Sequence, residues 1–190
     1  ADRFARAGAR YVVLVTKHHD GFCLWPSRVA NPHRAGWQSQ RDVVGELAEA
    51  VRARGLRFGV YYSGGLDWTF DERPLATPAD IFASVPSSEE YRRYAERQVR
   101  ELIERYRPSV LWNDIAWPFG GKRLWRLFAD YYAAVPDGVV NDRWMPRSAA
   151  WQLLRLRVVR AMVDTAAARL AVAKGIVPPK PPHFGFRTPE

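Results

Sequence analysis

The stretch that decides the fold reads Arg107-Pro108-Ser109-Val110-Leu111-Trp112-Asn113-Asp114-Ile115-Ala116-Trp117-Pro118. It predicts a short strand at residues 109–112, because an apolar run is bounded by a proline on one side and a polar turn on the other. Asp114 follows this strand directly and lies between two tryptophans in the sequence. A carboxylate at the end of a buried strand among aromatic side chains is well placed for chemistry, although an aspartate there can also simply cap the next turn.

Three more strands are predicted around this stretch, at residues 10–16, 56–62 and 138–141. The first is an almost continuous β-branched and aromatic run, which is typical of a parallel sheet buried on both faces. Helices are predicted at residues 43–54, 88–106, 124–134 and 149–174, so strands and helices alternate. The loops after the strands are long and polar, whereas the joints before them are short.

This asymmetry is typical of a parallel α/β barrel, in which the functional loops leave the carboxyl ends of the strands. A doubly wound open sheet gives a similar alternation, but its usual Gly-rich phosphate loop is missing here. We therefore expect an α/β fold, namely a partial (β/α)8 TIM-type barrel, because four strands make half of such a barrel.

Polar side chains stand at or after the end of each predicted strand: His18 and His19, Tyr61 with Asp67, Asp114, and Asp142 with Arg143. Because the carboxyl ends of parallel strands meet at one edge of a sheet, we expect a single site there. The adjacent histidines would need to leave strand geometry to bind one metal ion, since neighbours on a strand point to opposite sides. Neutral imidazoles suit a hydroxylated ligand, because they donate at one nitrogen and accept at the other. A third interpretation is that they are satisfied loop residues.

Tryptophans also gather at or beyond the predicted strand ends, namely Trp25, Trp37, Trp68, Trp112, Trp117 and Trp144. Each by itself can be a core residue, but together with carboxylates and histidines they favour a sugar site, since indole rings stack on the C–H faces of sugars. Sugar hydrolysis needs two carboxyl groups. Asp114 is the candidate nucleophile, and the second acid could come from Asp20, Asp67, Asp142 or Glu190.

Composition excludes several other classes of protein. The net charge is +9, but residues 1–144 hold 21 Lys and Arg against 18 Asp and Glu, while residues 145–190 hold eight against two. The body is therefore nearly balanced, which argues against a nucleic-acid partner. No apolar run approaches the roughly 18 residues that cross a bilayer, so we expect no membrane partner. The single cysteine, Cys23, allows no internal disulfide and no multi-cysteine metal site, and we expect a buried thiol.

A family resemblance begins in the stretch Thr16-Lys17-His18-His19-Asp20-Gly21-Phe22-Cys23-Leu24-Trp25-Pro26-Ser27. It closely resembles the signature of the α-L-fucosidases of glycoside hydrolase family 29. The resemblance continues through Arg41-Asp42-Val43-Val44, Gly59-Val60-Tyr61-Tyr62-Ser63, Leu111-Trp112-Asn113-Asp114, Val140-Asn141-Asp142-Arg143-Trp144 and Phe186-Arg187-Thr188-Pro189-Glu190.

The resemblance implies a retaining glycosidase that acts on terminal α-L-fucose of an oligosaccharide or glycoconjugate, with no metal or other cofactor. Asp114 matches the family's nucleophile, and Glu190 lies in the motif that supplies the acid/base in several members. The fucose-binding residues of the family match His18, His19, Tyr61 and Trp112, and an active-site arginine matches Arg143.

The sequence departs from the family pattern at both ends. We expect residues 1–190 to be a fragment of one catalytic barrel domain, with an atypical basic helical insertion at about residues 148–180. Because an open half-barrel leaves strand edges unpaired, we expect little or no activity from this chain alone. The alternatives are a non-catalytic fucose-binding remnant and a metal-dependent barrel hydrolase. Localisation and oligomeric state, a homo-oligomer included, stay open.

Overall fold

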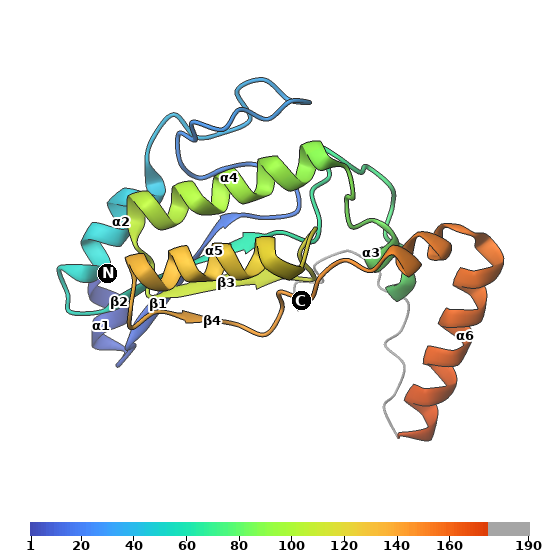
Figure 1. Ribbon diagram of the computed structural model, residues 1–190. Coiled ribbons are helices and arrows are strands. Elements are labelled where there is room, and N and C mark those ends of the chain that lie inside the picture. Colours follow the sequence, from blue (N-terminus) through green and yellow to red (C-terminus); the bar gives the residue numbers. More distant parts are fainter. Residues whose placement is uncertain (175–190) are drawn as a thin grey trace, which may run out of the picture. The chain divides into compact units, whose positions relative to one another are not determined.

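A four-stranded parallel sheet organises the first of two compact units, residues 1–73 with 84–147 (Figure 1). The computed structural model describes residues 1–174, apart from the side chains of Gln152 and Val172. The strands are β1 (Tyr11–Lys17), β2 (Arg57–Ser63), β3 (Val110–Asp114) and β4 (Val139–Val140). They lie in the order β1-β2-β3-β4, every neighbouring pair is parallel, and all four are close to their predicted bounds.

Four helices belong to this unit, and two of them begin at a capping side chain. They are α1 (Asp2–Arg6), α2 (Val43–Arg52), α4 (Glu89–Tyr106) and α5 (Gly121–Ala134). The Asp42 carboxylate caps α2 by accepting from the Gly45 N–H, and the Ser88 hydroxyl caps α4 by accepting from the Tyr91 N–H. Helix α4 ends where Arg107 takes a left-handed conformation, with φ of +41°.

Helices α2, α4 and α5 pack on the same face of the sheet (Figure 1). The apolar core between these layers includes Val44, Val51, Phe58, Val60, Val99, Leu102, Leu111 and Leu127. A doubly wound sheet reverses its strand order and carries helices on both faces. Here the order never reverses, so the sheet is part of a TIM-type barrel, as the sequence predicted.

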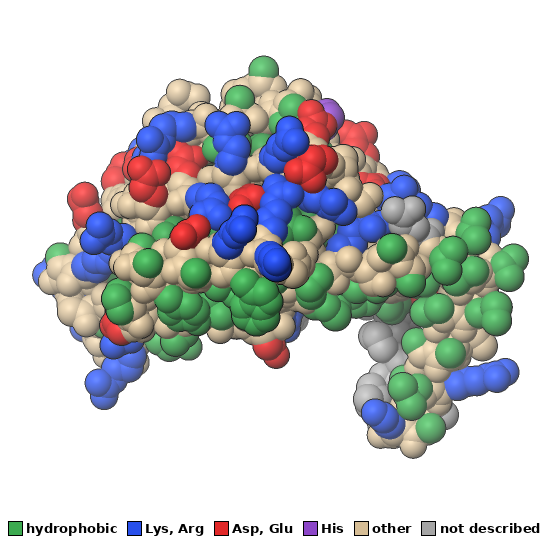
Figure 2. Space-filling model, viewed as in Figure 1, with side chains coloured by type: hydrophobic (Ala, Val, Ile, Leu, Met, Phe, Trp, Pro, Cys, Tyr) green, Lys and Arg blue, Asp and Glu red, His purple; other side chains and the backbone are tan. Residues whose placement is uncertain are grey.

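No helix of the first unit covers the opposite face of the sheet (Figure 1). Tyr11, Val15, Trp112 and Val139 lie on it and keep between 36% and 55% of their surface exposed. Figure 2 shows charged side chains over the helices and apolar side chains gathered in the lower part of the view. A complete barrel buries this face as its interior. The face is therefore where the described residues leave the fold open.

Among the described residues, the second unit contains residues 74–83 and 148–174. Its elements are α3 (Pro78–Ala83), the 3-10 helix η1 (Ala149–Arg155) and α6 (Arg157–Ala173). The predicted single helix over residues 149–174 is thus divided, because Leu156 is extended. Helix α3 was not predicted, since the prolines of that segment indicated a loop. Within this unit the Phe82 ring packs on Trp151, with 5.0 Å between centroids, and Arg160 pairs with Asp80 at 2.6 Å.

Two sequence predictions concern the end of the chain. The Pro-rich segment at 178–182 and Glu190 lie outside the described residues. The assignment of residues 148–180 as an insertion into one catalytic domain stays a prediction. Across residues 1–174, no helix is both long and apolar enough to cross a membrane.

Candidate active site

A β-bulge near the end of β1 decides which side chains reach each face of the sheet. Val15 pairs with Tyr61, but Lys17 pairs with Tyr62, so one residue is inserted between them. Strict alternation from Val15 would put Lys17 on the open face, whereas the bulge turns it to the helix side, where it is 1% exposed. His18 consequently reaches the open side, and its ring stacks on Tyr61 with 5.7 Å between centroids.

Asp114 ends β3 on the open face, paired in register with Ser63 at the end of β2. Its Oδ2 accepts a hydrogen bond from the Tyr61 hydroxyl at 2.7 Å, and its Oδ1 accepts from Arg143 Nη1 at 2.9 Å. Burial raises the pKa of Asp114, but the hydrogen bonds from Tyr61 and Arg143 outweigh it, so the pKa lies below its ordinary value. The side chain is 16% exposed. Asp114 is therefore an ionised carboxylate that a ligand can reach.

Tyr61 contributes to this arrangement as a neutral phenol. Burial, together with its hydrogen bond to the Asp114 carboxylate, raises the pKa of Tyr61 well above its ordinary value. The phenol keeps its proton at neutral pH and can donate it to Asp114. This contact orients one carboxylate oxygen without neutralising the charge of the group.

The backbone immediately after Asp114 is strained. Ile115 has φ of +71°, a conformation that β-branched residues rarely adopt. The Ala116 N–H donates to the Asp114 carbonyl at 2.9 Å and closes a three-residue turn, while the Gly65 N–H donates to the same carbonyl at 3.1 Å. A Cβ on Gly65 would lie 2.6 Å from the Ala116 nitrogen, so only glycine allows this approach. Packing of the loop after β2 thus holds Asp114 in place against the local backbone preference.

Two asparagines place Arg143 beside Asp114. The Asn113 side chain donates to the Arg143 carbonyl at 2.7 Å and to the Ala116 carbonyl at 2.9 Å. Asn141 exchanges two hydrogen bonds with the Asn113 backbone, at 3.0 and 2.8 Å, which continues the β3–β4 pairing beyond its last strand residues. The Arg143 backbone is therefore tied to β3, although its side chain is 57% exposed.

His18 and His19 lie just past the end of β1, with 4.0 Å between their ring centroids. The Nδ1 atom of His19 lies 2.6 Å from the Ser63 hydroxyl. Burial, followed by electrostatic interaction with the neighbouring His18, lowers the pKa of His19 to about 4, so this imidazole is neutral at about pH 7. In the part of the chain that the structure describes, no three His, Cys, Asp or Glu side chains form a group that could hold a metal ion.

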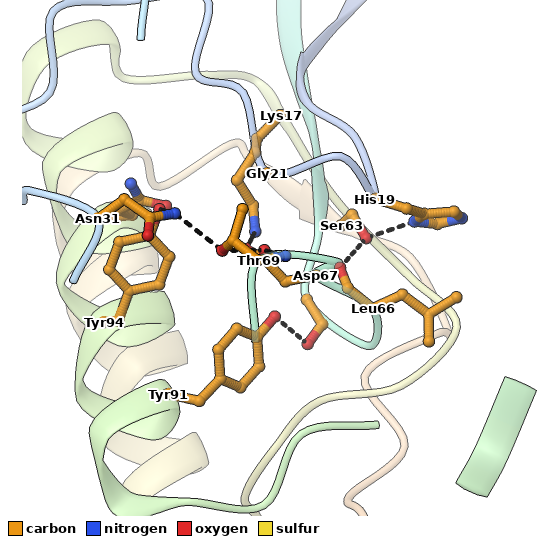
Figure 3. A network of polar contacts seen from close by, with 12 residues as sticks. Lys17, His19, Gly21, Asn31, Ser63, Leu66, Asp67, Thr69, Tyr91 and Tyr94 are labelled. Carbon is orange, nitrogen blue, oxygen red and sulfur yellow. Dashed lines mark hydrogen bonds and ion pairs between the residues drawn. The ribbon is translucent and has the colours of Figure 1, made fainter. Parts of the chain in front are cut away.

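A buried ion pair joins Lys17 of β1 to Asp67 of the loop after β2 (Figure 3). Lys17 Nζ lies 2.6 Å from Asp67 Oδ2, and both side chains are 0% exposed. Asp67 Oδ1 also accepts from the Thr69 N–H and hydroxyl, at 3.0 and 2.6 Å, and the ammonium lies 4.5 Å from the Tyr62 ring centroid. A Cβ on Gly21 would come within 2.6 Å of Asp67 Oδ1. The loop after β1 and the loop after β2 are thus packed together around this pair.

Three of the six tryptophans predicted at the sugar site are core residues instead. Trp25 and Trp117 are fully buried, and Trp144 is 5% exposed with its ring 4.8 Å from that of Trp117. The prediction was wrong for these three because the helices and loops on the covered face enclose them. Trp68 and Trp112 keep 42% and 36% of their surface exposed, and Trp112 lies on the open strand face. It remains the indole best placed to meet a ligand.

The structure narrows the set of candidates for the second catalytic carboxyl group. Asp67 is unsuited to acid/base work, because it is fully buried in its pair with Lys17. Asp20 is exposed and caps a turn by accepting from the Phe22 N–H, and Asp142 is also exposed. Among residues 1–174 none of these three is held against Asp114. Glu190 lies outside the described residues, so its role stays a prediction.

The structure brings six sequence-predicted residues to one end of the sheet: His18, His19, Tyr61, Trp112, Asp114 and Arg143. Sequence reasoning missed the side chains that hold them, namely Lys17, Ser63, Asn113 and Asn141. A weak signal was available, because each is a polar residue inside or directly after an apolar strand. Such residues must find a partner when buried.

Comparison with known proteins agrees with the geometry of the strand-end site. The α-L-fucosidase family model matches residues 1–155. Rat tissue α-L-fucosidase is 35% identical over 158 residues, covering 76% of this chain and 31% of the rat protein. Human plasma α-L-fucosidase is 39% identical over 160 residues, again covering 76% and 31%. The chain thus spans about a third of the length of these relatives.

Solved structures with the same arrangement come from Thermotoga maritima. Its α-fucosidase in complex with fucose is 50% identical with a TM-score of 0.70, over 80% of this chain and 35% of that one. The complex with a mechanism-based inhibitor is 52% identical with a TM-score of 0.70, over 75% and 34%. Relatives, sheet topology and strand-end site therefore agree, and this chain belongs to the α-L-fucosidase family, whose named members are glycoside hydrolases.

Proposed function

We propose that the site acts on terminal α-L-fucose of glycans or glycoconjugates, by a retaining double displacement in which Asp114 is the nucleophile. One observation carries the proposal: the Asp114 carboxylate is ionised, held at both oxygens and accessible from the open face. A carboxylate nucleophile must stay charged and be fixed in position, and Tyr61 with Arg143 supports both conditions.

The reaction proceeds in two displacements at the anomeric carbon. An oxygen of Asp114 bonds to that carbon while the glycosidic C–O bond breaks and an acid protonates the leaving oxygen. Water then attacks the same carbon, the conjugate base takes its proton, and Asp114 leaves as a carboxylate. We assign the acid/base role to Glu190, which this mechanism requires at about 5–5.5 Å from the nucleophile.

The remaining residues support recognition of a hydroxylated ring. His18, His19 and Arg143 offer hydrogen-bonding groups for sugar hydroxyls, and the exposed indole of Trp112 suits an apolar C–H face. The relevant partner is thus a fucosylated oligosaccharide or glycoconjugate. A fucose complex among the related structures of Thermotoga maritima supports the same ligand.

One observation favours a second function, binding of fucose without turnover. The sheet face that carries Asp114 is open in the first unit, whereas a barrel closes this face and excludes water from it. We therefore expect slow turnover, or none, from this chain alone.

The test combines a catalytic measurement with a binding measurement on the purified chain. Release of 4-nitrophenol from 4-nitrophenyl α-L-fucoside is compared for the unchanged chain, Asp114→Gly and Asp137→Asn. The last is a matched control, since Asp137 is an exposed acid in an ion pair with Arg57 at 3.4 Å. We expect turnover far below the 1–10³ s⁻¹ usual for enzymes, abolished by Asp114→Gly and kept by Asp137→Asn. Added azide should restore cleavage in Asp114→Gly and give the β-configured fucosyl azide.

Binding is followed by NMR through the histidine resonances, with D-fucose as the control for L-fucose. L-fucose should shift His18 and His19 while D-fucose does not. Binding with no turnover in any sample supports the binding function, whereas turnover that survives Asp114→Gly overturns the nucleophile assignment. Equal responses to the two sugars, or none to either, overturn both proposals.

A further inference from the structure

Ser63 lies at the centre of a short chain of hydrogen bonds behind His19 (Figure 3). It is the last residue of β2 and is fully buried. Its Oγ atom lies 2.6 Å from His19 Nδ1 and 2.7 Å from the Leu66 carbonyl oxygen. A contact of 2.6 Å is too short for a ring carbon, so the ring orientation with nitrogen toward Ser63 is the one that the site accepts.

The direction of each bond follows from counting protons. A carbonyl oxygen only accepts, so the proton between Leu66 and Ser63 must come from the serine hydroxyl. That hydroxyl carries a single proton, and its oxygen can then only accept from His19. His19 Nδ1 must therefore carry a hydrogen. The opposite assignment would leave two unprotonated oxygens 2.7 Å apart in a buried place, which is costly.

The remaining nitrogen of His19 is thereby an acceptor. The imidazole is neutral at neutral pH, since its pKa is lowered to about 4 by burial and then by electrostatic interaction with His18. A neutral ring with a hydrogen on Nδ1 has a lone pair on Nε2. In residues 1–174 the Nε2 atom has no hydrogen-bond partner, and in Figure 3 the ring projects away from the buried network. The Trp68 backbone N–H donates to the His19 carbonyl at 2.7 Å, which ties the His19 backbone to the loop after β2.

We propose that Ser63 is a positioning residue that fixes His19 in the Nδ1–H tautomer, so that Nε2 accepts a hydrogen bond from a hydroxyl of the sugar. The ligand part rests on the proposed function, whereas the tautomer rests on the contacts of Ser63 alone. The consequence is a specificity rule. The sugar hydroxyl that faces His19 Nε2 must donate a hydrogen bond. A sugar with fluorine in place of that hydroxyl cannot donate and should therefore bind more weakly.

The first experiment measures the tautomer directly in the unchanged chain. Long-range ¹H–¹⁵N correlation spectra distinguish a protonated from an unprotonated ring nitrogen, and His18→Gln, His33→Gln and His183→Gln identify the other three histidine rings. We expect a protonated Nδ1 and an unprotonated Nε2 for His19 at about pH 7. In Ser63→Ala both tautomers should be populated, and Ser63→Thr, which keeps the hydroxyl, should restore the single form. A hydrogen on Nε2 of the unchanged chain overturns the proposal even if every variant fails to fold.

The second experiment tests the specificity rule with L-fucose and its 2-, 3- and 4-deoxyfluoro analogues. Loss of the hydroxyl that donates to His19 should weaken binding about five- to tenfold in the unchanged chain, and about twofold or less in Ser63→Ala. Equal penalties in both chains overturn the role of Ser63. If fucose does not bind while Nδ1 is protonated, only the proposed function fails. If fucose binds and Nε2 is protonated, only this inference fails.

Discussion

Replacing Lys17 with methionine removes one charge from the ion pair buried between β1 and the loop after β2. Loss of one partner of a buried pair generally costs about 3–5 kcal/mol, because it leaves an uncompensated charge. Here both side chains are 0% exposed and 2.6 Å apart, so water cannot replace the missing ammonium. We expect Lys17→Met to lower the free energy of unfolding by about 3–4 kcal/mol.

Two features set this value below the top of the range. Asp67 keeps its hydrogen bonds from the Thr69 N–H and hydroxyl when Lys17 is gone. A stranded carboxylate can also discharge itself by binding a proton. For carboxyl groups in general this costs about 4 kcal/mol at about pH 7, from about three pH units at 1.36 kcal/mol each, and it limits the penalty.

The assay is urea unfolding followed by tryptophan fluorescence and circular dichroism. It compares Lys17→Met, Asp67→Asn and the double variant. The double variant should recover at least about 2 kcal/mol relative to the sum of the single losses, because neither charge is stranded. The exposed pair of Arg57 and Asp137, at 3.4 Å, is the matched control, and removing either partner should cost at most about 1 kcal/mol. A loss under about 1 kcal/mol for Lys17→Met, or single losses that simply add, would refute the reasoning.

Three further changes test other contacts of the site. Tyr61→Phe removes a hydrogen bond that holds the pKa of Asp114 down, so the pKa should rise in a ¹³C NMR titration of the carboxyl group. The stability that Asp114 contributes is lost as the pH falls through its depressed folded pKa, and in Tyr61→Phe that loss should begin at higher pH; an unchanged midpoint contradicts the assignment. Gly65→Ala puts a Cβ 2.6 Å from the Ala116 nitrogen and should lower the free energy of unfolding by about 1–3 kcal/mol. No measurable loss of stability would mean that the loop can move to accommodate the added methyl group. Burial raises the pKa of Cys23 to about 11, so its thiol should react slowly with a disulfide reagent at about pH 8 in the folded chain and rapidly in urea; fast reaction of the folded chain would contradict this burial.

The elements of the fold could be predicted because their signals are local. Apolar periodicity marks α2 and α4, and the caps at Asp42 and Ser88 mark where these helices begin. The four strands were recognisable as short apolar runs between turn residues. Helix α3 was missed, since the prolines around it carry the signal of a loop. The order of strands and helices, with long loops after the strands, was enough to predict part of a barrel.

The residues that make up the site could be predicted from the order of the strands. Parallel strands bring their carboxyl ends to one edge, so His18, Tyr61, Asp114 and Arg143 were expected together without any knowledge of distances. Which tryptophans face a ligand could not be predicted. Trp112 and Trp117 are close in sequence, yet one is 36% exposed and the other is fully buried.

The sequence by itself determined the four strands, the helices of the first unit, the family and the residue types at the strand ends. Tertiary structure decided how those residues are held. The bulge turned Lys17 away from the open face and toward Asp67, its partner 50 positions later. Ser63 met His19 from 44 positions away and set which nitrogen carries the hydrogen. Propensity, capping and apolar periodicity act over a few residues, whereas these pairings depend on strand register and loop packing, which exist only once the chain has folded.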